Sequence, residues 1–302
     1  MEINTEGFAG GFAADNGNAN GSRIFECGVE EFCPGELMAD VDEAELGRVQ
    51  SRSYFSTSCG LERRVNVLLP ANMTEGRKYP VLYMLHGIFG DENSFLNDKN
   101  NKLPEITVNM VKKGICGETI IVFPNMYASF RADQKPGMNS EDIKPYDYFI
   151  NDLVNDLMPF IEREFPVLTG RENTALAGFS MGGRETLFIA LKHPELFANI
   201  CSISAAPGLV PGRDWAMEHV GQLSEDEVRF APDALLPDRF IVCCGTKDSV
   251  VGRFPLSYHE LFEKNGIKHI WYEVTDADHD NNAIRSGYYN VLKQMAGSSA
   301  GA

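Results

Sequence analysis

Positive charge is scarce in this sequence. Its 27 Lys and Arg residues stand against 43 Asp and Glu residues, so the formal net charge at pH 7 is −16. A protein that binds duplex nucleic acid needs a basic face, and a polybasic membrane binder needs clustered Lys and Arg. The charge balance argues against both classes, and we expect neither nucleic acid nor a membrane as a partner.

Long apolar runs are also missing. No segment reaches the roughly 20 apolar residues that a membrane-spanning helix needs. The first residues contain neither the basic region nor the apolar region of a secretory signal. Two interpretations stay open: a cytoplasmic protein, or one whose signal peptide or neighbouring module lies before Met1. Of the two, we expect a secreted, extracellular protein.

Signatures of metal sites are absent as well. The seven cysteines include no C-x-x-C pair, and the chain contains no H-E-x-x-H motif. The odd count leaves at least one thiol free or intermolecular, and Cys27 with Cys33 could be a disulfide or two thiols. We expect no metal and no cofactor.

Composition divides the 302 residues into four segments. Residues 1–22 are rich in Gly, Ala and Asn and predict a flexible head, and residues 297–302 predict a flexible tail. Residues 23–48 form a lead-in that is too small for a core of its own. Residues 49–296 remain as one domain. Such ends are typical of a module that can be tethered to others through an N-terminal linker.

Apolar strands alternate with amphipathic helices through this domain, which predicts an α/β fold. The strands are apolar on both faces, so we expect a mostly parallel central sheet with helices on both sides. Two irregular stretches, 126–145 and 206–237, are long enough to build the wall or lid of a site. The predicted strands are 63–69, 81–85, 119–123, 174–179, 200–204, 240–244 and 269–274. The predicted helices are 103–113, 146–165, 182–191, 256–265 and 282–295.

Gly178-Phe179-Ser180-Met181-Gly182 is the one G-x-S-x-G match in the chain. A predicted strand leads into it and a predicted helix leads out, which is the setting of a nucleophile elbow. Such a turn holds the serine at strained backbone angles, above a helix N-terminus that favours negative charge. Ser180 is therefore the predicted nucleophile. The alternative is an ordinary Gly-rich turn between a strand and a helix.

One of the six histidines is well placed to act as a base for Ser180. His279 lies in a polar loop directly after the strand 269–274 and follows the serine in chain order. The others lie at solvated helix positions, at the start of a strand, in an insertion or behind a buried strand: His193, His259, His269, His219 and His86.

The acid that orients this histidine is expected between Ser180 and His279, just past a strand. Asp248 meets both conditions, because it follows the buried strand 240–244 and a turn. It would fix the imidazole tautomer and stabilise its charged form while His279 takes the serine proton. Other carboxylates are poorer candidates because they precede the strand or flank the histidine: Asp238, Asp276 and Asp278.

An oxyanion hole needs two backbone N–H donors. One is predicted at Met181, the residue after the nucleophile. The other is predicted in the loop after the strand 81–85, where we favour Ile88 and keep Gly87 as the alternative. His86 at the start of this loop then holds the loop and is not the general base.

These motifs together resemble carbohydrate esterase family 1, which contains feruloyl and acetylxylan esterases within the esterase D-like branch of the α/β-hydrolase superfamily. The resemblance implies that Ser180, Asp248 and His279 are nucleophile, acid and base. It implies an α/β-hydrolase sheet of about eight strands whose first strands are antiparallel. It also implies release of hydroxycinnamic or acetyl groups from plant cell-wall polysaccharide. Between Val49 and Met295 it rests on VLYMLHGIFGDENSF, TALAGFSMGG, ISAAP, CGTKDSVVG and ADHDNNAIRSGYYNVL.

The leading hypothesis is a serine carboxylesterase, a feruloyl esterase that acts on feruloylated arabinoxylan through an acyl-enzyme. Its partner would be acylated xylan or a small ester. Bulky residues of the irregular stretches would wall the acyl pocket, or would simply pack those stretches. These candidate substrate-binding residues are Tyr127, Phe130, Met138, Tyr146 and Trp215.

Three alternatives remain. Two are enzymes: an acetylxylan esterase of the same family, and a thioesterase similar to S-formylglutathione hydrolase. The third is a catalytically silent module for carbohydrate binding or scaffolding. The complete set of Ser180, Asp248 and His279 argues against the third.

Overall fold

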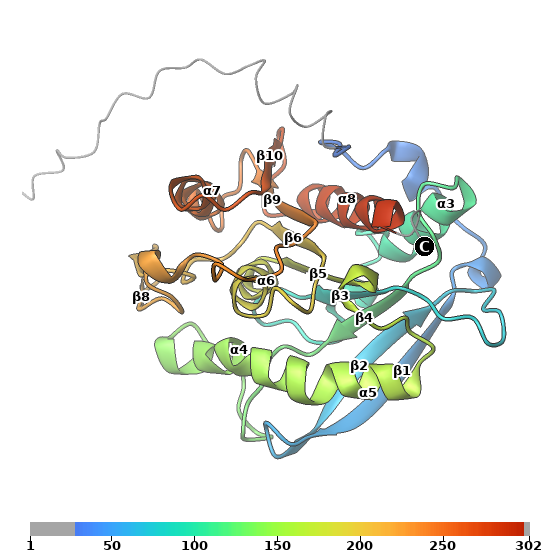
Figure 1. Ribbon diagram of the computed structural model, residues 1–302, viewed down its shortest axis with the longest axis horizontal. Helices are drawn as coiled ribbons and strands as arrows, with labels where there is room; N and C mark the ends of the chain where they lie inside the picture. Colours follow the sequence, from blue (N-terminus) through green and yellow to red (C-terminus); the bar gives the residue numbers. More distant parts are fainter. Residues whose placement is uncertain (1–27, 299–302) are drawn as a thin grey trace, which may run out of the picture.

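The computed structural model describes residues 28–298, and of residues 296–298 it describes the backbone alone. At its centre is an eight-stranded sheet with helices on both faces (Figure 1). The predicted flexible head, residues 1–22, lies outside the described residues. In spatial order the strands are β1 (Arg48–Ser56), β2 (Leu61–Leu69), β4 (Ile120–Pro124), β3 (Val81–Leu85), β5 (Thr174–Phe179), β6 (Asn199–Ile203), β9 (Arg239–Gly245) and β10 (Ile270–Val274).

Strand direction changes only near one edge of this sheet. The pairs β1–β2 and β2–β4 are antiparallel, and every pair from β4 through β10 is parallel. All five residues of β3 are buried. A strand covered on both faces needs apolar side chains at every position, which explains its unbroken apolar run. The predicted α/β fold and the antiparallel first strands are confirmed.

Helices cover the two faces of the sheet in two groups. The first group is α4 (Ser140–Asp152), the π-helical segment η3 (Leu153–Leu157), α5 (Met158–Glu164), α6 (Met181–Lys192) and α7 (Phe254–Lys264). The second group is α3 (Leu103–Lys112) and α8 (Asn281–Ser298). The shorter elements are α2 (Ser94–Asn97), β7 (Gly212–Arg213), β8 (Glu218–His219), η1 (Gly35–Met38), η2 (Glu43–Glu45), η4 (Arg171–Asn173) and η5 (Glu225–Glu227).

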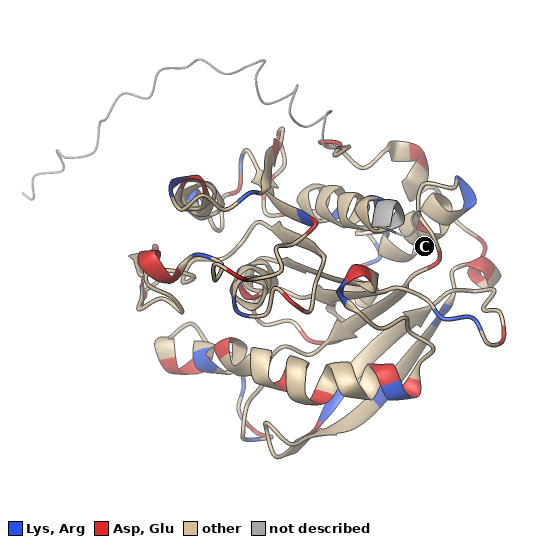
Figure 2. Cartoon of the chain, viewed as in Figure 1, with Lys and Arg blue, Asp and Glu red and all other residues tan. Residues whose placement is uncertain are grey.

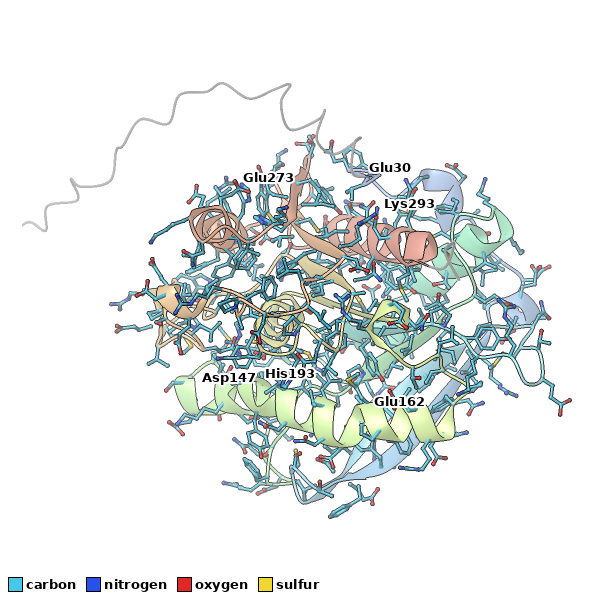
Figure 3. All side chains as sticks on the ribbon, viewed as in Figure 1. Glu30, Asp147, Glu162, His193, Glu273 and Lys293 are labelled. Atoms are coloured by element: carbon cyan, nitrogen blue, oxygen red, sulfur yellow. The ribbon has the colours of Figure 1, made fainter. Side chains whose placement is uncertain are left out.

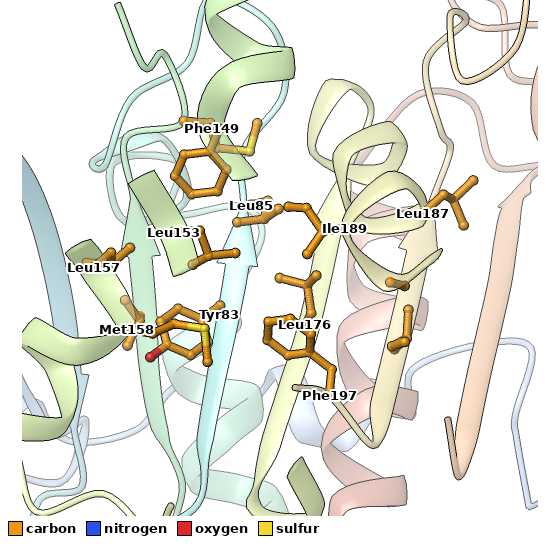
Figure 4. Close-up of a cluster of buried hydrophobic side chains, with 14 of the residues drawn as sticks. Tyr83, Leu85, Phe149, Leu153, Leu157, Met158, Leu176, Leu187, Ile189 and Phe197 are labelled. Carbon is orange, nitrogen blue, oxygen red and sulfur yellow. The ribbon is translucent and has the colours of Figure 1, made fainter. Parts of the chain in front are cut away.

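The core between the sheet and the first group of helices fixes the central strands. Tyr83 and Leu85 of β3 and Leu176 of β5 pack with Leu153 of η3 and Ile189 of α6 (Figure 4). Full burial of a side chain of this kind contributes about 1.5–3 kcal/mol. The carboxyl ends of β3 and β5, which lead into the predicted site, are therefore held on a rigid base.

Helix α4 begins earlier than the sequence predicts, at Ser140 instead of Tyr146. Asn139 caps it, because its side-chain oxygen accepts the N–H groups of Glu141 and Asp142 at 3.1 and 3.0 Å. Acidic residues in a first turn also interact favourably with the helix dipole. Pro145 lies inside this helix and lacks the N–H of one helical hydrogen bond. Because this proline lies close to the N-terminus of α4, the cap and the acidic first turn offset the one helical hydrogen bond that is lost.

The described part of the lead-in is a layer of the domain and not a separate segment. Val29 and Leu37 are 1% and 0% exposed and belong to the core beside α8. The N–H of Glu30 donates to Asn290 Oδ1 at 2.9 Å, and the carboxylate of Glu30 pairs with Lys293 (Figure 3). The described part of the predicted lead-in thus completes the cover of one sheet face, and it has no core of its own, as expected.

At the other end, α8 continues to Ser298, so residues 297 and 298 are helical and do not begin a tail. The six described cysteines are all free: Cys33, Cys59, Cys116, Cys201, Cys243 and Cys244. Cys27 lies outside the described residues, so a pairing with Cys33 stays open. Between residues 28 and 298 no helix combines the length and apolarity of a membrane span. Acidic and basic residues are interspersed along α4 and α5 (Figure 2).

Candidate active site

Ser180 occupies the turn between β5 and α6. Its φ of 59° and ψ of −116° place it outside the regions that a residue with a side chain prefers. Its N–H donates to the carbonyl of Ile203 at 2.9 Å, and its own carbonyl accepts the N–H of Ala206 at 2.9 Å. The chain of β6 and its continuation therefore hold the backbone of this strained residue on both sides.

Two glycines of the motif are required by close approach of the backbone. A Cβ added to Gly178 would lie 2.2 Å from the carbonyl oxygen of Gly182. A Cβ added to Gly182 would lie 2.2 Å from the carbonyl oxygen of Leu85. Any side chain at either position would separate α6 from the sheet, which explains the G-x-S-x-G spacing physically.

His279 is held by Asp248. Its Nδ1 lies 2.9 Å from Asp248 Oδ2, and Asp248 Oδ1 accepts the N–H groups of Val250 and Val251 at 3.1 and 3.0 Å. An ionised carboxylate only accepts, so Nδ1 carries a hydrogen and Nε2 of the neutral ring presents a lone pair. Burial raises the pKa of Asp248, but the hydrogen bonds from His279 and Val251 outweigh it and hold the pKa below its usual range.

The carboxylates that flank His279 have other partners. Asp278 Oδ1 accepts the backbone N–H groups of Ser249 and His279, both at 2.7 Å. It therefore ties the loop after β9 to the loop after β10. Asp276 pairs with Lys247 at 2.7 Å in solvent. Among the described residues Asp248 alone contacts the imidazole of His279 through a carboxylate.

The structure brings Ser180, Asp248 and His279 to one edge of the sheet, at the carboxyl ends of β5, β9 and β10. The ring of His279 lies against Phe179, the residue before Ser180, with ring centroids 4.3 Å apart. Ser180 Oγ forms no hydrogen bond to His279 in the described part of the chain. Such contacts are often looser before substrate binds. The catalytic roles of the three residues stay a prediction.

Gly87 lies directly beside Ser180. A Cβ built on Gly87 would be 3.4 Å from Ser180 Cβ and 3.8 Å from its Oγ. The carbonyl of Gly87 lies 2.7 Å from His86 Nδ1 and accepts the N–H of Gly90 at 3.2 Å. In a trans peptide the C=O and N–H point in opposite directions, so the N–H of Ile88 points away from His86 and Gly90.

The three predicted oxyanion donors are available. Within residues 28–298 the N–H groups of Met181, Gly87 and Ile88 have no protein acceptor. A backbone donor left without an acceptor near a reactive serine can bind a developing oxyanion. The assignment of Met181 with Ile88, or with Gly87, stays a prediction.

Two buried side chains brace this loop, and sequence reasoning found only one of them. His86 Nε2 accepts the N–H of Met126 at 2.9 Å, and burial lowers the pKa of His86 to about 4. Its ring is therefore neutral and structural, as predicted. Tyr146 OH accepts the N–H of Phe89 at 3.0 Å and is fully buried. Tyr146 therefore positions the loop, which agrees with the packing alternative, and its place in an acyl pocket stays a prediction.

The other predicted pocket residues occupy different environments. Tyr127 is 8% exposed, packs on Tyr146 with ring centroids 5.1 Å apart, and donates its hydroxyl to the carbonyl of Lys135. Three predicted residues lie at the surface, with exposures of 58%, 43% and 80%: Phe130, Met138 and Trp215. Tyr146 is thus a packing residue, Tyr127 also lines the polar groove described next, and the other three have side-chain surface to offer a ligand. A role of these residues in binding substrate stays a prediction.

A polar groove of about 420 Å³ lies beside the oxyanion loop. Phe89 and Gly90 of that loop line one part, and Arg64, Asn125 and Gln134 supply donors and acceptors. Such a lining suits a ligand rich in hydroxyl groups. A second cavity, of about 110 Å³, includes Thr119 at the amino end of β4 and lies at the opposite edge of the sheet.

The remaining histidines have partners of their own. His193 pairs with Glu195 at 2.9 Å and is partly exposed, as predicted. His219 is 7% exposed and lies 3.0 Å from Asp214. His259, predicted as a solvated helix residue, instead lies 2.8 Å from Nε2 of His269, so that prediction is wrong.

A buried ion cluster lies one turn below Ser180, and sequence reasoning missed it. The guanidinium of Arg184 pairs with Glu185 at 2.6 Å and with Asp147 of α4, which Figure 3 labels. Gln222 donates to Asp147 at 3.2 Å and to Glu185 at 2.9 Å. The cluster ties α6, α4 and the stretch 206–237 together. Adjacent opposite charges on a helix that leaves a buried strand were the signal available in the sequence.

Comparisons with known proteins place the chain among esterases. The model of the Esterase family matches residues 56–281. An endo-1,4-beta-xylanase/feruloyl esterase of Xylanibacter ruminicola is 30% identical over 197 residues, 62% of this chain and 26% of that protein. Esterase MT1326 of Mycobacterium tuberculosis is 32% identical over 157 residues, 51% of this chain and 32% of that protein. The chain thus spans about a quarter to a third of the length of these curated relatives.

A solved structure is similar over nearly its whole length. It is the CE1 ferulic acid esterase AmCE1/Fae1A from Anaeromyces mucronatus in complex with ferulic acid. It is 41% identical, covers 89% of this chain and 98% of that chain, and superimposes with a TM-score of 0.83. The chain therefore belongs to the Esterase family, has the α/β-hydrolase fold, and is similar to a CE1 ferulic acid esterase.

Proposed function

We propose that this chain is a feruloyl esterase that uses Ser180, His279 and Asp248 to hydrolyse hydroxycinnamoyl esters of xylan. The observation that carries the proposal is the oriented Asp248–His279 pair beside the strained turn of Ser180. The 41% identity to a ferulic acid esterase supports ferulate as the acyl group.

In the first half of the reaction Ser180 Oγ attacks the ester carbonyl while His279 Nε2 takes its proton. The tetrahedral oxyanion is bound by the N–H groups of Met181 and of Ile88 or Gly87. His279 then returns the proton to the sugar oxygen, which leaves as an alcohol and breaks the C–O bond. In the second half water attacks the acyl-enzyme, His279 again acts as base, and the free acid leaves with Ser180 restored.

The polar groove beside Phe89 and Gly90 is the proposed place for the sugar part of the substrate. Its amide and guanidinium groups can bond sugar hydroxyls on the side of the oxyanion loop. A net charge of −16 disfavours a strongly anionic polymer, so a neutral, arabinose-decorated xylan fits better. Because this polymer lies outside the cell, we propose that the chain is secreted.

Tethering to other modules is part of the same proposal. The xylanase/feruloyl esterase that this chain resembles is about four times as long as the matched region, since only 26% of it is covered. The Gly-, Ala- and Asn-rich residues 1–22 have the composition of a flexible linker. Through such a linker a neighbouring module could hold the esterase near its polymer.

The decisive experiment compares kcat/KM on methyl ferulate, 4-nitrophenyl acetate, acetylated xylan and S-formylglutathione. We expect the highest value on methyl ferulate, and Ser180→Ala to remove almost all turnover while the circular dichroism spectrum is retained. Ser249→Ala is a matched control, because this serine lies beside Asp248 and outside the proposed triad. A clear preference for S-formylglutathione or acetylated xylan, or a substantial residual rate in Ser180→Ala, would contradict the proposal.

A further inference from the structure

Two histidines and a glutamate meet on the domain far from the predicted triad. His259 and Glu263 lie on α7, and His269 directly precedes β10 (Figure 1). One potential ligand atom from each of the three lies within 4.8 Å of the other two. Since His279 follows the opposite end of β10, the five residues of this strand, at about 3.3 Å each, separate the cluster from the triad.

The hydrogen bonds of His269 decide which of its nitrogens faces the cluster. Its Nδ1 lies 2.8 Å from the carbonyl oxygen of Ile267, which can only accept, so Nδ1 carries the hydrogen of the neutral ring. Its Nε2 then presents a lone pair toward His259 Nδ1, 2.8 Å away. A histidine that donates one N–H to a backbone carbonyl and offers its other nitrogen is the usual arrangement of a metal-ligating imidazole.

Aromatic packing fixes both rings in this orientation. The ring of His259 stacks on Trp271 with centroids 4.9 Å apart and an interplanar angle of 9°. The ring of His269 meets the edge of Phe262 at 5.3 Å and 86°. Residues four apart share a helix face, so Glu263 lies one turn beyond His259 on the same side of α7. The two imidazole rings would therefore lose little rotamer freedom on binding an ion, whereas the exposed side chain of Glu263 would become ordered.

We propose that His259, Glu263 and His269 form a site for a divalent transition-metal ion, with Zn²⁺ as the best fit. Two imidazole nitrogens and one carboxylate oxygen are ligands that suit Zn²⁺, whereas Mg²⁺ and Ca²⁺ prefer oxygen ligands alone. Water completes the four-coordinate shell. The ion takes the place of the hydrogen between His259 Nδ1 and His269 Nε2. That hydrogen moves by way of solvent to Nε2 of the His259 ring, so both imidazoles bind in their neutral forms and no net proton is released.

The ion acts as a structural cross-link. It joins α7 to the start of β10, which is the edge strand of the sheet. A ligand that binds only the folded chain stabilises it by mass action. Because the site and the triad lie at opposite ends of β10, we expect no direct effect of the ion on the chemical step.

The site is tested with the untagged, EDTA-treated full chain. Isothermal titration calorimetry with Zn²⁺ is expected to show one ion per chain with a dissociation constant of about 1 µM or below. At a free Zn²⁺ concentration about 100 times that constant, Tm is expected to rise by about 5 °C. The chain has two tryptophans, so in a Trp215→Phe background Cu²⁺ is expected to quench the emission of Trp271 at the same stoichiometry.

Variants distinguish a built site from surface binding. His259→Phe keeps a ring stacked on Trp271 and removes both nitrogens, and we expect affinity to fall at least about 100-fold. Glu263→Gln is expected to weaken binding by about 10- to 100-fold. His193→Phe, which removes a partly exposed histidine beside Glu195, is the matched control and keeps the wild-type affinity. Retained circular dichroism and esterase activity in His259→Phe establish that it folds.

Two results would overturn the proposal. One is the absence of stoichiometric Zn²⁺ binding to the wild-type chain, which would make the pair a simple imidazole–imidazole hydrogen bond. The other is equal loss of affinity in His193→Phe and His259→Phe, which would mean weak binding to scattered histidines. Neither result depends on the identity of the ester substrate.

Discussion

Replacement of Asp248 by asparagine tests how the proposed base is oriented. In the structure Asp248 Oδ1 accepts the N–H groups of Val250 and Val251, and Oδ2 faces His279 Nδ1 at 2.9 Å. Those two N–H groups can only donate, so an asparagine must keep its oxygen toward them. Its NH₂ group then faces His279 and donates, so Nδ1 must accept and the ring hydrogen moves to Nε2.

In that tautomer Nε2 cannot take the proton of Ser180. The equivalent change in Ser-His-Asp hydrolases lowers kcat by about 10⁴-fold, which corresponds to about 5 kcal/mol of transition-state stabilisation. Asparagine has the shape of aspartate, so we expect the fold to persist. The measurement is kcat on methyl ferulate, with a circular dichroism melt to show that the variant is folded.

Asp278→Asn is the matched control for this experiment. Asp278 is one residue from His279, but its Oδ1 accepts the backbone N–H groups of Ser249 and His279, and an amide oxygen can do the same. We expect kcat within about tenfold of the wild-type value, because charge is lost but the tautomer is kept. If Asp248→Asn retained more than a tenth of the rate, or if Asp278→Asn lost as much, the orientation argument would be refuted.

Three further predictions concern the surroundings of the site. Tyr146→Phe removes the acceptor of the Phe89 N–H, which costs about 1–3 kcal/mol if that donor stays unpaired. We expect kcat to fall about tenfold with KM little changed. The control is Tyr127→Phe, which loses a hydroxyl bonded to the carbonyl of Lys135 and is expected to have a smaller effect. Arg184→Met leaves Glu185 buried without its partner, and we expect the free energy of unfolding, measured by urea denaturation, to fall by about 3–5 kcal/mol. Arg163→Met, at an exposed position, is the control and is expected to change that free energy by less than about 1 kcal/mol. Burial lowers the pKa of His86 from 6.5 to about 4, so its contribution to stability is complete above pH 6.5 and is lost as the pH falls from 6.5 to 4. The loss in the free energy of unfolding amounts to about 3 kcal/mol. Urea unfolding at pH 7 and pH 4.5 measures it. If the free energy of unfolding fell by the same amount between these pH values in the wild type and in His86→Asn, the loss could not come from His86.

Local signals were enough to predict seven of the eight strands of the central sheet and the strained turn at Ser180, whereas the edge strand β1, which is largely exposed, was not predicted. The apolar run of β3 and the glycines around Ser180 report on immediate surroundings, namely cover on both faces and backbone contacts near 2.2 Å for any added Cβ. Chain order and strand ends were enough to select Asp248 and His279, because the carboxyl ends of parallel strands share one edge. These features could be predicted because they depend on residues adjacent in the sequence or on a general rule of sheet topology.

Other features depend on residues that are distant in the chain and have no local signature. The bounds of the domain are decided by Val29 and Leu37, which pack against α8, although a compositional change suggested a break at residue 49. The start of α4, by contrast, has a local signal in the Asn139 cap and the acidic first turn, which the predicted start at Tyr146 missed. Burial and capping outweigh such propensities, because tertiary contacts contribute more free energy than a single unfavourable residue costs.

The sequence alone therefore determined the α/β sheet, the strained turn at Ser180 and the meeting of Asp248 with His279, since each follows from local pattern or strand topology. Only the tertiary structure decided that Tyr146 lies beneath the oxyanion loop, that Arg184 is buried among carboxylates, and that His259 meets His269. Each of these contacts joins side chains from separate elements. Which side chains come into contact depends on how the helices pack on the sheet, and the periodicity of one segment of the sequence cannot predict that packing.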